Sequence, residues 1–315
     1  MARWITIASL PGAQLLVQDA NDHEANVQAE MAYWNAQIKK VLPDKPDLIV
    51  TPECCDRPAG LSGEQKVAYY RARGDRMRDF FMQQAIQHHT NIAYGAMRVL
   101  PDGTCRNSIQ FINRQGGIDG IYNKNMLVIE EHTQQNALYG AQVQAIQTDF
   151  GRVTGCICFD LNFEQPLQDT VRAQPELIVF ASAYHGGIMQ QHWAYMARAY
   201  FVSCVFGTRT ASIINPVGEV IAQSSNYYPY LTAKINLDYQ VVHLDHNWDK
   251  LQAMKEAYGD SVSLCTPYGL GCVLLTNHGQ GSMADIVRQF DIETWDRYYA
   301  RSVAARHLPG RLESI

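Results

Sequence analysis

Short apolar runs alternate with segments of helical periodicity over the first 238 residues of the chain. Apolar runs rich in β-branched side chains predict buried strands, and they lie at residues 3–10, 48–51, 91–97, 176–180 and 203–207. Apolar positions spaced three and four residues apart predict helices, and they lie between Asp22 and Pro43 and at residues 63–89, 165–172 and 189–200. This alternation predicts a layered α/β fold.

Two predicted hairpins indicate that the sheet is mixed. Residues 108–113 and 118–122 flank a Gly-rich turn, and residues 212–215 and 220–222 flank a Pro-Val-Gly-Glu turn. Antiparallel hairpins inserted among parallel strands give a mixed sheet.

Beyond residue 238 the alternation weakens. Helices are predicted at residues 247–257 and 284–304, with strand-like material near 269–276. We therefore predict one domain at residues 1–238 and a C-terminal extension at residues 239–315. The extension is expected to pack on the core or across a dimer.

Composition narrows the classes of protein. A net charge of −5 and a pI of about 6.0 argue against nucleic-acid and anionic-membrane partners. No apolar run approaches the roughly 18 residues of a membrane span, and the N-terminus resembles a strand more than a signal peptide. The eight cysteines show neither a disulfide framework nor paired Cys-x-x-Cys motifs. We expect reduced thiols, a cytoplasmic location, no metal site and no cofactor.

Three residues whose side chains could take part in catalysis stand where apolar runs end. Glu53 follows residues 48–51 and Pro52, Lys124 follows residues 117–123, and Cys158 ends the run that begins at Gly155. Each has an ordinary explanation when it is taken alone: a surface glutamate, a solvated lysine and a buried structural thiol. A base at a buried strand end is expected to have a raised pKa, and ligands of open α/β sheets bind at the carboxyl ends of strands.

Taken in order, residues 48–53, 117–127 and 155–160 resemble the motifs of the nitrilase (carbon–nitrogen hydrolase) superfamily, which carry a Glu–Lys–Cys triad. Further similarity lies in residues 149–153, in His192-Trp193 with Arg198-Ala199, and in the hairpin at residues 215–218. The resemblance covers roughly residues 3–238. It implies a four-layer α-β-β-α sandwich and a homodimer or larger homo-oligomer.

The resemblance also implies roles for individual residues. Cys158 is the expected nucleophile, Glu53 the base, and Lys124 the charge that stabilises the developing anion, helped by the backbone N–H of Phe159. Relatives carry a second glutamate between the lysine and the cysteine, and Glu131 fits that spacing slightly better than Glu130.

The roles expected for the other residues near the cysteine are less specific. Asp160 is expected to be a structural hydrogen-bond acceptor, and Cys156 a structural neighbour of the nucleophile. Candidate substrate contacts are Phe159, Asn162, Tyr184 and His185, although a structural role is the alternative for Tyr184 and His185. Arg209 is a candidate partner of a substrate carboxylate, with a structural salt bridge as its alternative.

The sequence after the cysteine favours one branch of the superfamily. True nitrilases usually have Trp-Glu after the nucleophile, whereas this chain has Phe159-Asp160, and Asn162 stands where many relatives have arginine. We therefore expect a small amide or N-carbamoyl substrate that is cleaved through a thioester. The alternatives are a nitrilase, an acyltransferase and a non-catalytic scaffold. The adjacent Cys54 and Cys55 have no explanation at this level.

Overall fold

The structure is a computed structural model that describes residues 2–17, 19–207 and 210–313. It divides into two compact units. The larger unit spans Ile5–Ile235. The smaller unit combines the N-terminal residues up to Trp4 with the chain from Asn236 onward.

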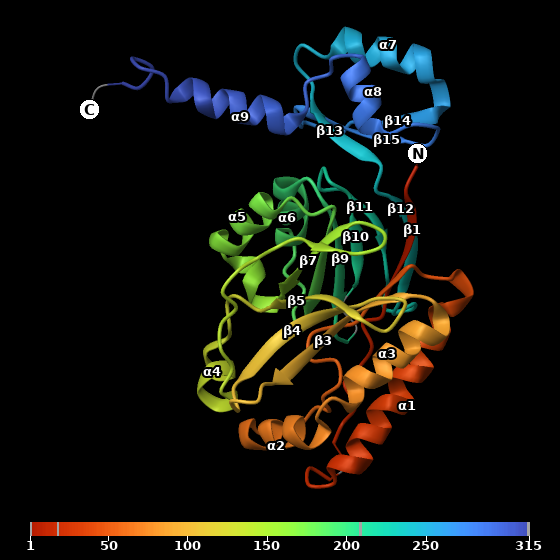
Figure 1. Cartoon of the computed structure of the whole chain (residues 1–315), viewed down its shortest axis with the longest axis vertical. Coiled ribbons are helices and arrows are strands. Elements are labelled where there is room, and N and C mark those ends of the chain that lie inside the picture. Colours follow the sequence, from red (N-terminus) through yellow and green to blue (C-terminus); the bar gives the residue numbers. More distant parts are fainter. Residues whose placement is uncertain (1, 18, 208–209, 314–315) are drawn as a thin grey trace. The chain divides into compact units, whose positions relative to one another are not determined.

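Two six-stranded sheets form the centre of the larger unit (Figure 1). In spatial order the first sheet contains β12 (Leu231–Asn236), β1 (Trp4–Ser9), β2 (Leu48–Val50), β3 (Asn91–Val99), β4 (Cys105–Ile112) and β5 (Ile118–Asn123). The second contains β11 (Val220–Gln223), β10 (Ser212–Ile214), β9 (Tyr200–Val205), β8 (Leu177–Ser182), β7 (Arg152–Ile157) and β6 (Ile146–Gln147). Strands β1–β2–β3 and β7–β8–β9 are parallel, and the predicted hairpins β4–β5 and β10–β11 are antiparallel. The prediction of mixed sheets is confirmed.

Helices cover the outer face of each sheet (Figure 1). The first sheet carries α1 (His23–Val41), α2 (Gly63–Arg73) and α3 (Arg76–His88), and the second carries α5 (Glu164–Ala173) and α6 (Met189–Ala197). Both α2 and α3 pack on β3, while α6 packs on β9. The predicted α-β-β-α layering is therefore confirmed, with the short helix α4 (Ile129–Gln135) following β5.

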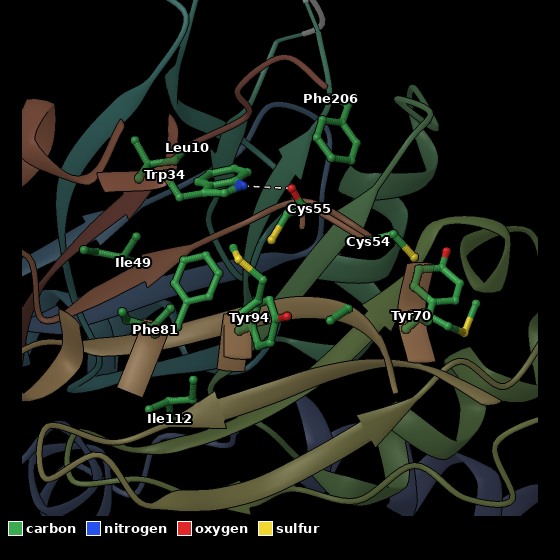
Figure 2. Packing of buried hydrophobic residues seen from close by; sticks show 14 of the residues in the cluster. Leu10, Trp34, Ile49, Cys54, Cys55, Tyr70, Phe81, Tyr94, Ile112 and Phe206 are labelled. Carbon is green, nitrogen blue, oxygen red and sulfur yellow. Dashed lines mark hydrogen bonds between the residues drawn. The ribbon is translucent and has the colours of Figure 1, made fainter. Parts of the chain in front are cut away.

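Helix α1 shows how local sequence builds the first core. Asp22 caps the helix by accepting a hydrogen bond of 2.9 Å from the Ala25 N–H. Trp34 is completely buried and donates its indole N–H to the carbonyl oxygen of Cys55 at 2.8 Å. Figure 2 shows Trp34, Cys54 and Cys55 in one apolar cluster. The adjacent cysteines are thus core residues, and both are reduced.

Two predicted helices are interrupted. The single helix predicted over residues 63–89 is two helices, because Gly74 between them has φ of 55°, which ends α2. The helix predicted over residues 284–304 is likewise α8 (Met283–Gln289) and α9 (Trp295–Arg306). In addition, α6 ends at Ala197 because Arg198 is left-handed, so β9 begins earlier than the predicted residue 203.

The smaller unit has its own sheet and core. Strands β13 (Tyr239–His243), β15 (Cys272–Asn277) and β14 (Val262–Cys265) form an antiparallel sheet, accompanied by α7 (Trp248–Tyr258), α8 and α9. A separate apolar cluster fills the space between sheet and helices. Its docking on the core or across a dimer stays a prediction. None of the helices in the described part of the chain is long and apolar enough to cross a membrane.

Candidate active site

The ends of three strands bring the predicted triad together. Glu53 follows β2, Lys124 follows β5, and Cys158 follows β7. The Lys124 Nζ lies 2.8 Å from Oε1 of Glu53. The Cys158 thiol interacts with the Glu53 carboxylate and with the backbone of Ala183. Side chains that are far apart in sequence thus share one site.

A second carboxylate also pairs with the lysine. Glu131, in the first turn of α4, places Oε2 at 2.7 Å from the Lys124 Nζ. The same oxygen accepts the backbone N–H of Val128 at 2.9 Å. Glu130, the neighbouring residue, is exposed to solvent. The structure therefore brings Glu131, and not Glu130, to the predicted lysine.

Asn107 connects the two carboxylates and was not predicted from the sequence. Its Nδ2 donates to Oε1 of Glu53 at 2.7 Å and to Oε1 of Glu131 at 2.6 Å. The side chain is almost fully buried. Asparagine is unfavourable in strands, but the predicted strand began at residue 108, whereas β4 begins at Cys105, so the sequence carried no indication that Asn107 lies in a strand.

Burial and charge act in opposite directions on the lysine and the glutamate. Burial alone would lower the pKa of Lys124, which is 1% exposed, but the charges of Glu53 and Glu131 outweigh it and raise that pKa above its ordinary value. Burial alone would raise the pKa of Glu53. The Lys124 charge and the hydrogen bonds from Lys124 and Asn107 nevertheless hold it below the ordinary value of 4.5. The expectation of a raised Glu53 pKa was therefore wrong.

The cysteine is held as a thiol in a strained backbone. Burial and the neighbouring Glu53 carboxylate raise the pKa of Cys158 to about 12, although the Lys124 charge opposes them. Its φ of 48° places a non-glycine residue in the left-handed region. Such strain costs about 1–3 kcal/mol and persists where the surroundings fix the conformation. The resting site thus contains a neutral thiol beside an ionised carboxylate.

Two glycines allow the backbone to approach the site closely. A Cβ on Gly95 in β3 would lie 2.3 Å from the carbonyl oxygen of Pro52, the residue before Glu53. A Cβ on Gly140 would lie 2.3 Å from the carbonyl oxygen of Asn123, the residue before Lys124. Gly140 also donates its N–H to the Lys124 carbonyl at 2.7 Å. Only glycine fits these contacts without moving the segments that carry the glutamate and the lysine.

Asp160 fixes the turn that follows the cysteine. Its carboxylate accepts hydrogen bonds from the Tyr122 hydroxyl at 2.7 Å and from the backbone N–H groups of Met126 at 2.7 Å and Ile157 at 3.0 Å. Burial raises its pKa to about 6 even though these donors favour the ionised form. The structural role that was predicted for Asp160 is confirmed by these contacts.

Two candidate substrate contacts, Phe159 and Asn162, lie in the short 3-10 helix that begins at Cys158. Phe159 is 37% exposed and packs edge-on against Phe163, with ring centroids 4.9 Å apart. Asn162 is exposed and donates its amide to the Phe159 carbonyl at 3.3 Å. Both side chains are therefore available beside the cysteine, and their contact with a substrate stays a prediction.

The other two candidates follow β8. Burial raises the pKa of Tyr184 to about 12. The side chain of Asn162 lowers this pKa, and Cys158 raises it. His185 is partly tied to the protein: its Nδ1 accepts the Gly187 N–H at 3.1 Å, and its Nε2 lies 3.3 Å from Oγ1 of Thr210. These contacts favour the structural interpretation of His185. Arg209 lies outside the described residues.

Two further cysteines, Cys156 and Cys54, lie near the site. Cys156 is fully buried in β7, and burial raises its pKa well above the ordinary value. Cys54 contacts Oδ1 of Asn107 through its thiol at 3.9 Å. Within residues 2–17, 19–207 and 210–313, no group of three or more His, Cys, Asp or Glu side chains is arranged to hold a metal ion.

Comparison with known proteins identifies the family of the chain. The family model described as carbon–nitrogen hydrolase matches residues 6–240 of the chain. A search of curated proteins returned no match. Glu53, Lys124 and Cys158 lie within this matched range.

Several solved structures have a similar fold. A carbon–nitrogen hydrolase from Helicobacter pylori G27 has a TM-score of 0.62 at 15% identity, covering 75% of this chain and 90% of that one. Nit3 from Saccharomyces cerevisiae, a member of branch 10 of the nitrilase superfamily, has a TM-score of 0.62 at 17% identity, covering 82% and 95%. An amidase from Nesterenkonia sp. has a TM-score of 0.58 at 14% identity, covering 73% and 90%. At such identities these likenesses establish the fold.

Proposed function

Because the chain belongs to the carbon–nitrogen hydrolase family, we propose that it cleaves the C–N bond of a small amide or N-carbamoyl compound through a thioester on Cys158. The observation that carries this proposal is the contact of Glu53 with both Lys124 and Cys158 in one buried cluster. A base, a cation and a nucleophile within reach of one another are the requirements of thiol-based acyl transfer.

The first half of the reaction forms the thioester. Glu53 takes the thiol proton as the Cys158 sulfur attacks the carbonyl carbon, because a thiol with a pKa of about 12 needs a base at neutral pH. A C–S bond forms and the carbonyl electron pair moves onto oxygen. Lys124, charged throughout, stabilises that oxygen together with the Phe159 N–H. The tetrahedral intermediate then expels the amine, which takes the proton from Glu53.

The second half releases the acid. Glu53, again ionised, takes a proton from water as the water oxygen attacks the thioester carbon. The C–S bond breaks, and the proton held by Glu53 returns to the Cys158 sulfur. Glu131 keeps Lys124 in place through the 2.7 Å contact and does not itself exchange protons with the substrate.

Three features support an amide over a nitrile substrate. Phe159-Asp160 replaces the Trp-Glu pair that true nitrilases usually carry, and Asn162 replaces an arginine. Structural similarity includes the Nesterenkonia amidase. We place Phe159, Asn162 and Tyr184 beside the substrate, because the first two share the short helix that begins at Cys158 and the pKa of Tyr184 is raised in part by Cys158. In the same proposal the enzyme works as a homo-oligomer in the cytoplasm, without metal or cofactor.

Ammonia release over a panel of aliphatic amides, N-carbamoyl amino acids, ω-amides and nitriles tests the proposal. Intact-mass measurement in the same samples detects a trapped acyl adduct. A variant of the Nesterenkonia amidase carries the product of acrylamide addition at its active-site cysteine, so acrylamide serves as an additional thiol probe. We expect ammonia from an amide or carbamoyl substrate and a single adduct on Cys158.

Two cysteine variants separate the catalytic thiol from an accessible one. Cys158→Ala should abolish both ammonia release and the adduct. Cys265→Ala, which removes another partly exposed thiol, should leave both unchanged. Activity that survives in Cys158→Ala would exclude the proposed nucleophile. An adduct that turns over only when an amine is added would favour an acyltransferase. The absence of both adduct and ammonia across the panel would favour a non-catalytic scaffold.

A further inference from the structure

A cavity of about 270 Å³ lies where α2 passes into α3 above the first sheet. Its lining includes four arginines, namely Arg71 and Arg73 from α2, Arg78 from α3 and Arg98 from β3. Asp75 is the one carboxylate in that lining. The four guanidinium groups come from three different elements, so the positive charge surrounds the cavity instead of following one helix.

Only two of the four arginines are neutralised by the protein. Arg73 forms a buried ion pair with Asp56, and Arg78 pairs with Asp75 at 3.0 Å and with Asp79 at 2.8 Å. Among the residues that the structure describes, no carboxylate forms an ion pair with Arg71 or Arg98. The cavity therefore has an excess of positive charge.

The unpaired arginine on the sheet is also partly buried. Burial lowers the pKa of Arg98, and the neighbouring charges of Arg106 and Arg78 lower it further against the opposing effect of Asp75. Confining cations without counter-charges costs free energy. An anion in the cavity would offset this cost.

A largely buried side chain with an unpartnered amide provides a second, independent indication of a ligand. Gln110 in β4 lines the cavity and is 3% exposed, yet no other described residue forms a hydrogen bond with its side-chain amide. Neither atom of this amide is among the fully buried polar atoms without a partner, so the amide is open to the cavity that it lines. Gln110 stands opposite Tyr94 in the β3–β4 register, and both line the cavity on the same face of the sheet as Arg98. Its amide offers two N–H donors to a bound oxygen.

We propose that this cavity binds a phosphate group, either as inorganic phosphate or as the phosphomonoester of a small molecule. Arginine forks match phosphate oxygens in bidentate geometry. A tetrahedral dianion can accept donors from α2, α3 and β3 at once, whereas a planar carboxylate presents two oxygens in one plane. The volume lies just below the range of about 300–1,000 Å³ for drug-sized ligands, which favours a small ligand. The proposal is independent of the amide hydrolysis proposed above.

Calorimetric titration of the full-length chain tests this site. Inorganic phosphate and glycerol 3-phosphate are titrated separately at constant ionic strength, with sodium chloride as the blank. We expect saturable binding of at least one probe at one site per chain. Arg98→Gln should weaken that binding at least tenfold. Arg71→Gln, at an exposed position that folding tolerates, should do the same.

Arg76→Gln is the matched control. Arg76 lies on α3 and pairs with Glu24 outside the cavity, so its loss should change the affinity less than twofold. A preference for inorganic phosphate or for the ester identifies which source of the phosphate group the site accepts. The absence of saturable binding, equal weakening in all three variants, or loss of binding in Cys158→Ala would each overturn the proposal.

Discussion

The Nδ2 of Asn107 lies 2.7 Å from Oε1 of Glu53, and the Nζ of Lys124 lies 2.8 Å from the same oxygen. One carboxylate oxygen of Glu53 therefore receives two strong donors. The other oxygen, Oε2, accepts the Ala183 N–H at 3.2 Å. A carboxylate fixed through one oxygen presents the other in a defined direction. This arrangement makes Oε2 the oxygen that is suited to proton exchange with Cys158.

Replacing Asn107 with leucine should slow catalysis by disturbing this orientation. A hydrogen bond to a charged group contributes about 1.5–3 kcal/mol, so kcat should fall about 10- to 100-fold with a smaller change in KM. Because the Asn107 hydrogen bond lowers the pKa of Glu53, the acid limb of the pH–rate profile should move to higher pH. Steady-state kinetics across pH measures both effects.

A purely structural role for Asn107 gives a different result. In that case Asn107→Leu would lower the melting temperature. The acid limb of the pH–rate profile, measured on the protein that remains folded, would stay at the pH of the parent protein. An unchanged kcat together with an unchanged acid limb would contradict the positioning role.

The pH dependence of the parent protein should be broad. Activity requires ionised Glu53, whose pKa is below 4.5, so the acid limb of kcat/KM that Glu53 controls should lie below about pH 4.5. The thiol of Cys158 titrates near 12, and the pKa of Lys124 lies above its ordinary value of 10.5. No basic limb is therefore expected below about pH 10. A pH–rate profile over the range in which the protein stays folded measures both limbs, and a limb between pH 6 and 9 would contradict these assignments.

The two adjacent glutamates offer a matched pair of variants. Glu131→Gln removes one of the two charges that raise the pKa of Lys124 while keeping the side-chain shape. We expect kcat to fall by about tenfold, in line with the loss of one charge-assisted contact. The basic limb should also move to lower pH as the lysine loses its proton more easily.

Glu130→Gln is the control for that experiment. Glu130 is exposed, so kinetics and melting temperature should stay within error of the parent protein. Equal effects in the two variants would mean that the charge of the α4 terminus matters and not the Glu131–Lys124 contact.

Sequence periodicity predicted most of the fold because strands and hairpins follow local patterns. It failed at helix ends. Gly74, with φ of 55°, interrupts a helix whose apolar periodicity continues on both sides. Residues 290–294 separate α8 from α9, and Asp291 among them also has a positive φ, of 49°. Whether the chain bends at such a point depends on tertiary packing, and periodicity does not record that packing.

The sequence predicted only those site residues that stand at strand ends or within recognisable motifs. Glu53, Lys124 and Cys158 stand at such ends, and the resemblance of their motifs to the carbon–nitrogen hydrolase superfamily predicted that they share one site. Asn107 lies inside a strand, and its two contacts arise from tertiary structure alone. The sign of the Glu53 pKa shift was mispredicted for the same reason, because it depends on the 2.8 Å distance to Lys124.

Gly95 links the fold directly to the position of the base. A methyl group on Gly95 would meet the Pro52 carbonyl oxygen at 2.3 Å, a contact with backbone that rotation of a side chain cannot relieve. Gly95→Ala should therefore push the Glu53 segment away from β3. We expect a loss of about 1–3 kcal/mol in the free energy of unfolding and, since a 1 Å misplacement of a reacting group costs about 100-fold, a comparable fall in kcat.

Gly271→Ala provides the control, because a Cβ there meets no atom within 4 Å. That variant should leave both the free energy of unfolding and kcat unchanged. Chemical denaturation and steady-state kinetics on the two variants make the comparison. If Gly95→Ala loses stability but keeps its kcat, the segment from Pro52 to Glu53 adapts without moving the carboxylate. The close approach at Gly95 would then serve folding alone and would have no part in placing the base.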